Sequence, residues 1–123
     1  MSTATMSTRQ VFEEYIHALS GKPKTDEVIR QYVTDPALEQ HIHQVEAAFP
    51  SYSIEIHTTV VEGDYVAVRG TFHGTHRGEF AGIAATGRTV SADLMVFYQI
   101  EDGRIAKFWW QADMAGLIGQ LTA

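Results

Sequence analysis

The sequence predicts an α+β fold in which N-terminal helices pack on a curved antiparallel sheet and a short helix follows the last strand. Before residue 50, apolar residues recur at the three- and four-residue spacing of amphipathic helices. From Tyr52 onward, β-branched and aromatic residues dominate, and turn signals divide them into strands. Helices first and strands afterwards is typical of a fold that keeps its two layers apart. The chain has 123 residues, of which 45% are hydrophobic, so we expect one domain over residues 1–123.

Three helices are expected in the N-terminal part. The first covers residues 7–19, where apolar residues form one stripe. The second begins after Thr25, a good N-cap, and must end before Pro36 because proline disfavours helical geometry in the residue before it. The third begins at Pro36, which suits the first helical turn, and ends before Pro50.

Four strands are expected, at residues 52–61, 65–73, 89–100 and 104–112. Turn signals around Gly63 and Gly103 join the first pair and the last pair as hairpins. Residues 74–87 carry four glycines and exceed an ordinary hairpin loop, so we expect this segment to form a lid or rim. A last short helix is expected after Asp113.

Composition and charge exclude several partners and cofactors. Nine basic against fifteen acidic residues give a net charge of −6, which argues against nucleic acids and anionic membrane surfaces. No apolar run is long enough to span a bilayer, and no secretory signal is visible at the N-terminus, so we expect a cytoplasmic protein. The chain has no cysteine and no phosphate-binding loop, and His41 and His43 would lie about 200° apart around a helix, so no cofactor or metal is expected.

Asp113 is the most suggestive residue for chemistry. It follows the apolar strand at residues 104–112, where burial beside tryptophan would favour the protonated carboxyl that general acid catalysis uses. Strand alternation places Trp109, Gln111 and Asp113 on one face, which could bind and polarise a carbonyl compound. Asp is also a preferred N-cap for the helix that follows, and the sequence leaves both roles open.

Whether Asp93 joins this face depends on the register of the last hairpin. A two-residue turn at Asp102 and Gly103 would put Asp93 and Asp113 on opposite faces. A three-residue loop with a bulge at Gly103 would instead pair Asp93 with Gln111 and bring both carboxylates to one face. We favour the three-residue loop, because glycine suits the left-handed position of that bulge.

The other candidate site residues are histidine and apolar or aromatic side chains. His41 lies on the flank of the third helix's apolar stripe. It could therefore line a cavity between helix and sheet, or else be a half-buried histidine bonded to a backbone carbonyl. Tyr15, Met95 and Phe80, from the first helix, the third strand and the glycine-rich segment, are expected to contact a small hydrophobic ligand.

Both faces of the last strand are apolar. Phe108 and Trp110 lie on one face and Trp109 on the other. Because the helices can cover only one face of the sheet, another copy of the chain is the simplest cover for the second. We therefore expect a homodimer formed through the sheet face opposite the pocket.

Several segments of the chain resemble the SnoaL-like polyketide cyclase, or ester cyclase, family, which belongs to the NTF2-like superfold. They are residues 62–76, 78–87 and 98–109, and the pattern from Asp113 to Leu121 that contains Gly116, Leu117 and Gln120. The resemblance covers roughly residues 8–121. It implies a cone-shaped α+β barrel, usually dimeric, that closes polyketide rings by intramolecular aldol condensation without metal or cofactor.

The resemblance also implies roles for particular residues. It places the family's acid/base aspartate at Asp113, and His41 matches a helix position where the family often has His or Asn. Two positions depart from the family pattern. Phe108 stands where a histidine commonly precedes the tryptophan of the last strand, and Ala84-Ala85 replaces a Pro-Pro pair in the long loop. Both departures affect the expected pocket rim and neither touches Asp113.

Three functions from different classes are therefore open. The first is a cofactor-free enzyme that uses aspartate acid/base catalysis, for aldol-type cyclisation or isomerisation, on an apolar carbonyl compound. The second is a non-catalytic module for small-molecule binding or dimerisation. The third, an epoxide hydrolase, is disfavoured because Ser91 stands where such enzymes on this fold have an arginine two residues before Asp93. A closed apolar cavity that ends at Asp113 would favour the first.

Overall fold

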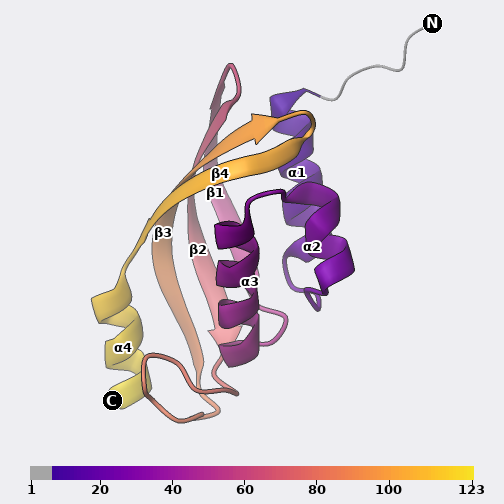
Figure 1. Ribbon diagram of the computed structural model, residues 1–123. Helices are drawn as coiled ribbons and strands as arrows, with labels where there is room; N and C mark the ends of the chain where they lie inside the picture. The colour runs from indigo at the N-terminus through magenta and orange to yellow at the C-terminus, as the bar shows by residue number, and fades with distance from the viewer. Residues whose placement is uncertain (1–6) are drawn as a thin grey trace, which may run out of the picture.

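Over residues 7–123, four helices and four strands follow one another in the predicted order (Figure 1). The structure is a computed structural model that describes residues 7–123. The helices are α1 (Thr8–Leu19), α2 (Asp26–Tyr32), α3 (Pro36–Ala48) and α4 (Met114–Thr122). The strands are β1 (Ser53–Glu62), β2 (Tyr65–Thr75), β3 (Thr89–Glu101) and β4 (Arg104–Ala112). The predicted absence of a secretory signal concerns residues outside the described part of the chain.

The helix starts follow from their capping residues. Ser7 Oγ accepts a hydrogen bond from the Gln10 backbone N–H at 3.1 Å, and Gln10 Oε1 accepts one from the Ser7 N–H at 2.9 Å. This is the capping box that the sequence predicts for α1. Thr25 and Asp35 cap α2 and α3 in the same way, through side-chain oxygens. None of the helices in residues 7–123 is long and apolar enough to cross a membrane.

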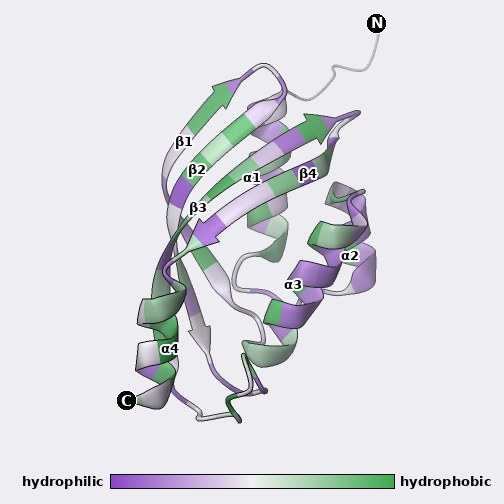
Figure 2. Cartoon of the chain, turned by 60° about the vertical axis from the view of Figure 1, so that its left-hand side comes forward, coloured by the Kyte–Doolittle hydropathy of each residue, from purple (hydrophilic) through white to green (hydrophobic). Residues whose placement is uncertain are grey.

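The strands form one antiparallel sheet in the order β1-β2-β3-β4, and the sheet curls around helices α1–α3 (Figure 1). Hydrophobic and hydrophilic residues alternate along the strands (Figure 2), because successive side chains of a strand point to opposite faces. On the concave face, Val66, Val68, Val96 and Tyr98 pack with the buried side of α1, including Phe12. The convex face carries no helix from α1–α3. This is the NTF2-like arrangement that the resemblance implies.

The register of the last hairpin differs from the prediction. Asp102 and Gly103 both have left-handed backbone angles, with φ of 51° and 76°, as a two-residue type I′ turn requires. The expected three-residue loop is therefore wrong. The pairing shifts by one residue beyond the turn, between Gln99 and Ile100, and this bulge reverses which residues share a face. Asp93 and Asp113 consequently lie on the same face, as predicted, but for a different reason.

The glycine-rich segment between β2 and β3 is an ordered rim. His76 donates its backbone N–H to Arg88 O at 2.8 Å, and its carbonyl accepts the Gly87 N–H at 2.8 Å. The buried His76 ring accepts the Thr86 N–H at Nδ1, at 3.2 Å, so Nε2 is the ring nitrogen that can carry a proton. A tight turn at the tip then packs Phe80 against the core cluster around α4.

Candidate functional site

An apolar cavity lies between helices α1 and α3 and the concave face of the sheet. The volume that the centre of a water molecule could occupy inside it is about 140 Å³. On the same measure, a cavity needs about 10–15 Å³ to hold one water. Its wall includes side chains from all four strands, from α1, α3 and α4, and from the rim segment. The cavity therefore has the size and composition of a site for a small apolar organic molecule.

Few polar side chains reach this cavity. They are Tyr15, Ser20, Lys24, His41, Tyr52 and Tyr98. Burial raises the pKa of Tyr15, Tyr52 and Tyr98, because the phenolate is poorly solvated there. All three phenols consequently stay protonated at neutral pH, and each has an O–H that can donate a hydrogen bond.

His41 stands on α3 at the aromatic side of the cavity. Its ring centroid lies 4.8 Å from that of Trp110 and 5.4 Å from that of Phe108, both of which face the cavity from β4. Burial among these rings lowers the pKa of His41, because the imidazolium is poorly solvated. At neutral pH the ring is therefore uncharged and one of its nitrogens has a lone pair that can accept a proton.

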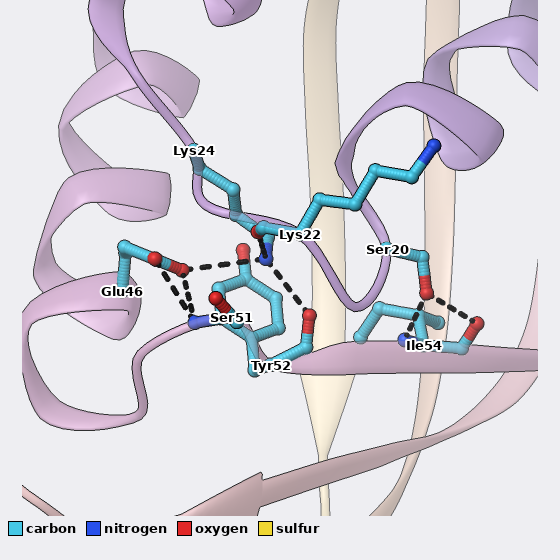
Figure 3. A network of polar contacts seen from close by, with 7 residues as sticks. All are labelled: Ser20, Lys22, Lys24, Glu46, Ser51, Tyr52 and Ile54. Atoms are coloured by element: carbon cyan, nitrogen blue, oxygen red, sulfur yellow. Dashed lines mark hydrogen bonds and ion pairs between the residues drawn. The ribbon is translucent and has the colours of Figure 1, made fainter.

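Lys24 closes another part of the cavity wall through a buried network (Figure 3). Its side chain is 1% exposed, and Nζ lies 3.3 Å from Glu46 Oε1 and 3.9 Å from the centroid of the Tyr52 ring. Nζ also donates to the carbonyls of Lys22 and Tyr52, each at 2.8 Å. Burial lowers the pKa of Lys24, and Glu46 opposes this effect. The ammonium's three donors are thus taken, and Lys24 ties the α1–α2 loop to the start of β1.

Sequence reasoning missed this lysine. Lys24 stands in a short loop, outside any apolar stripe, and lysine is almost never fully buried unless it is paired. Its partner Glu46 is 22 residues further along the chain. No local pattern in the sequence links the two.

The structure divides the predicted site residues between two faces of the sheet. Tyr15, His41 and Phe80 line the cavity. Five others, Asp93, Met95, Trp109, Gln111 and Asp113, are exposed on or beside the convex face. The expectation that these five face the cavity is wrong. The helices cover the face of β4 that carries Phe108, Trp110 and Ala112, and strand alternation turns Trp109 and Gln111 to the other side.

Asp113 acts as the N-cap of α4. Its carboxylate accepts a hydrogen bond from the Gly116 N–H at 2.9 Å, and its own N–H donates to Asp93 O at 2.9 Å. The capping role that the sequence left open is therefore present. Asp93 in turn accepts a hydrogen bond from Thr71 Oγ1 at 3.2 Å, and His57 Nε2 lies 2.8 Å from the same hydroxyl, so this row of polar groups belongs to the convex face.

One surface cluster holds residue types that bind metals. Oxygens of Asp26 and Glu39 and a ring nitrogen of His43 lie within 4.8 Å of one another. His43 Nε2 is already 2.7 Å from Asp26 Oδ1, and Arg30 pairs with Glu39 at 3.0 Å. The cluster is an exposed ion-pair network in which the arginine would oppose a cation.

Comparison with known proteins agrees with this architecture. The sequence profile of the SnoaL-like polyketide cyclase family matches residues 11–121, and no curated protein sequence matches the chain. TsrD from Streptomyces laurentii is 28% identical with a TM-score of 0.75, over 97% of this chain and 98% of that one. IdmH from Streptomyces antibioticus, described as a candidate polyketide cyclase, is 20% identical with a TM-score of 0.78, over 96% and 100% of the two chains.

A third similar structure has a different assignment. AclR from Streptomyces galilaeus, described as a candidate hydroxylase, is 24% identical with a TM-score of 0.79, over 94% of this chain and 80% of that one. At this identity the likeness establishes the fold, since one fold carries many activities. The profile match covers most of the sequence, and the chain belongs to the SnoaL-like polyketide cyclase family.

Proposed function

We propose that this protein is a cofactor-independent acid/base enzyme that acts on an apolar carbonyl compound, by aldol-type cyclisation or isomerisation. The observation that carries the proposal is His41, a neutral imidazole on the wall of an apolar cavity. A neutral ring with a pKa below its usual range is a competent proton acceptor at neutral pH. The apolar wall excludes water from a reactive enolate.

The proposed chemistry needs only proton transfers and one new carbon–carbon bond. His41 takes a proton from the carbon beside a carbonyl group. The enolate carbon then attacks a second carbonyl of the same molecule, and the imidazolium returns the proton to the alkoxide that forms. Trp110 and Phe108 pack on the imidazole and fix its orientation toward the cavity.

The aspartate mechanism implied by the family resemblance is the alternative. The Asp113 carboxylate is exposed and caps α4, so it could act in the cavity only if the first turn of that helix moved. Its exposed position also favours the second function class, a binding module in which the cavity holds a ligand without turnover. The epoxide hydrolase alternative has no support in the described residues. Arg69 on β2 is the arginine that could replace the one missing before Asp93, and it is exposed and donates to Thr58 Oγ1 at 3.2 Å.

Proton exchange at a ketone tests these alternatives without knowledge of the natural substrate. In deuterium oxide, the wild-type protein should accelerate exchange of the α-protons of 2-tetralone, followed by proton NMR. His41→Gln should lower this rate by about 10²–10⁴-fold, and Asp113→Asn should leave it unchanged. Loss of exchange only in Asp113→Asn would establish the aspartate mechanism instead. No acceleration by the wild-type protein would favour the binding module.

We also propose that the convex face forms a homodimer. Met95, Phe97 and Trp109 are 62%, 55% and 50% exposed, and Phe97 pairs with Trp109 across β3 and β4. Tyr65 extends the patch, with its ring centroid 6.5 Å from that of Trp109. Single exposed apolar residues are common, whereas a contiguous patch of this kind is typical of an interface.

A further inference from the structure

The cavity is elongated along α3 and β3. On α3 its wall extends over residues 38–49, which is about 16 Å at the rise of a helix. On β3 the wall extends over residues 92–98, about 20 Å of strand. His41 lies toward the Tyr98 end of this space, because the Phe108 ring that it contacts belongs to the residue paired with Tyr98.

Phe80 closes the other end of the cavity. At the C-terminal end of α3, Phe49 packs edge-on against Phe72, the β2 partner of Ala92, with ring centroids 5.1 Å apart. Phe80 packs on the same Phe49 ring, with centroids 5.2 Å apart. It is the side chain through which the rim segment, residues 76–88, contributes to the cavity wall. In Figure 1 and Figure 2 this segment lies between α4 and the C-terminal end of α3.

The base of the rim segment is fixed to the end of α3. The backbone N–H groups of Arg77 and Gly78 both donate to Ala48 O, at 2.9 and 3.1 Å. Gly78 lies so close to α3 that a side chain at this position would collide with the helix backbone. The buried His76 ring packs on Phe49, with ring centroids 5.4 Å apart. The rim segment and the end of α3 therefore form one packed unit.

A tight turn at the tip of the rim segment presents Phe80 to the cavity. Ala81 and Gly82 have left-handed backbone angles, with φ of 51° and 79°, as a two-residue type I′ turn requires. Phe80 and Ile83 exchange backbone hydrogen bonds of 3.0 and 2.8 Å across this turn. Ile83 packs on the core cluster around α4 and lies outside the cavity wall. Movement of the Phe80 ring away from the cavity would break this packing, so the rim segment is a fixed wall.

We propose that Phe80 limits the length of the ligand that the cavity accepts. A fixed aromatic ring at the end of an elongated apolar space adds contact area to a ligand that just reaches it and excludes a longer one. The proposal rests on the proposed function only in that the ligand occupies this cavity. It requires no turnover and no particular functional group on the ligand.

A series of compounds that differ only in length, the 4-n-alkylphenols from 4-ethylphenol to 4-octylphenol, tests the proposal. Their dissociation constants are measured by NMR titration of the ¹⁵N-labelled protein. In the wild-type protein, each added methylene should tighten binding about fourfold until the alkyl chain reaches Phe80, and the gain should then stop. Phe80→Ala should move this limit to longer alkyl chains and leave the affinity for 4-ethylphenol unchanged, which also shows that the cavity is intact.

Two further variants complete the test. Phe80→Leu should move the limit by a smaller amount, and it provides the same comparison if Phe80→Ala does not fold. Ile83→Ala removes an apolar side chain from the same turn but outside the cavity wall, so it should keep the wild-type limit.

Four results would overturn the proposal: no binding of the series by the wild-type protein, no length limit in the wild type, an unchanged limit in the Phe80 variants, or an equal change in Ile83→Ala. The outcome is separable from that of the proposed function. A limit that depends on Phe80, found without α-proton exchange at 2-tetralone, would leave the length selection intact and refute the enzyme. Exchange with a limit that does not depend on Phe80 would do the reverse.

Discussion

The buried Lys24–Glu46 pair gives a stability prediction that follows from its asymmetry. The Lys24 side chain is 1% exposed and that of Glu46 is 19% exposed. Changing Glu46→Gln removes the counter-charge from an ammonium that cannot reach water. Changing Lys24→Met removes the ammonium itself and leaves a carboxylate that is partly hydrated and accepts the Ser51 N–H at 2.9 Å.

The expected magnitudes differ accordingly. Leaving a buried charge without its partner costs about 3–5 kcal/mol. The two carbonyls and the Tyr52 ring that still contact Nζ reduce this, so we expect Glu46→Gln to lower the free energy of unfolding by about 2–3 kcal/mol. Lys24→Met should lower the free energy of unfolding by about 1 kcal/mol or less. The contacts of the ammonium are lost, but the cost of burying that charge is lost with them. The Tyr52 carbonyl also keeps its hydrogen bond from the Gly21 N–H, at 2.9 Å.

Urea denaturation of the two single variants and the double variant measures these differences. The double variant Lys24→Met/Glu46→Gln should be more stable than Glu46→Gln alone, because it no longer contains the unpaired ammonium. The denaturant slope should stay constant across the set, so that midpoints report stability. Destabilisation by Lys24→Met equal to that by Glu46→Gln, or additive losses in the double variant, would show that the unpaired ammonium is not the source of the loss.

Three further predictions concern the cap, the sheet face and pH. Asp113→Asn should leave the free energy of unfolding nearly unchanged and Asp113→Ala should lower it by about 1 kcal/mol; equal losses in thermal or urea denaturation would contradict the capping role. Sedimentation should give a dimer at micromolar concentration and a monomer for Trp109→Lys, whereas a monomeric wild type would exclude the proposed interface. Because burial lowers the pKa of His41, α-proton exchange should be constant near neutral pH and should fall as the pH drops through that lowered pKa; a rate that rises toward acid would contradict a neutral histidine base. The same shift means that the folded state binds a proton at His41 less readily than the unfolded state, so the stability from this residue is present at neutral pH and decreases below about pH 6.5.

Local signals in the sequence were sufficient for the elements of the fold. Proline and capping residues such as Asp35 define the helix starts, and the change from helical to alternating periodicity at Tyr52 defines the sheet. The separation of Trp109 from its neighbours Phe108 and Trp110 was also predictable, since strand alternation is local.

The side of the sheet that holds the site was not predictable in the same way. Alternation states that Trp109, Gln111 and Asp113 share a face, but the choice of the face that the helices cover depends on contacts such as that between His41 and Trp110. These contacts join residues far apart in the chain. The bulge between Gln99 and Ile100 likewise leaves no local signal, and it changed the expected pairing of Asp93.

The Lys24–Glu46 pair was missed for the same reason. It joins a loop to a helix that is not its neighbour in sequence, and each residue alone matches an ordinary loop or helix position. The resemblance to the SnoaL-like family predicts Asp113 as the acid/base residue. The cavity in this chain instead presents His41.

The location of a bound ketone distinguishes the two faces of the sheet, and we expect the ligand on the concave side. Intermolecular nuclear Overhauser effects between 2-tetralone and the side chains of this protein distinguish its two faces. We expect contacts to cavity residues such as Ile42, Val68 and Leu94. Contacts to Met95 and Trp109, which are exposed on the convex face, would contradict it and would return the site to the face that carries Gln111.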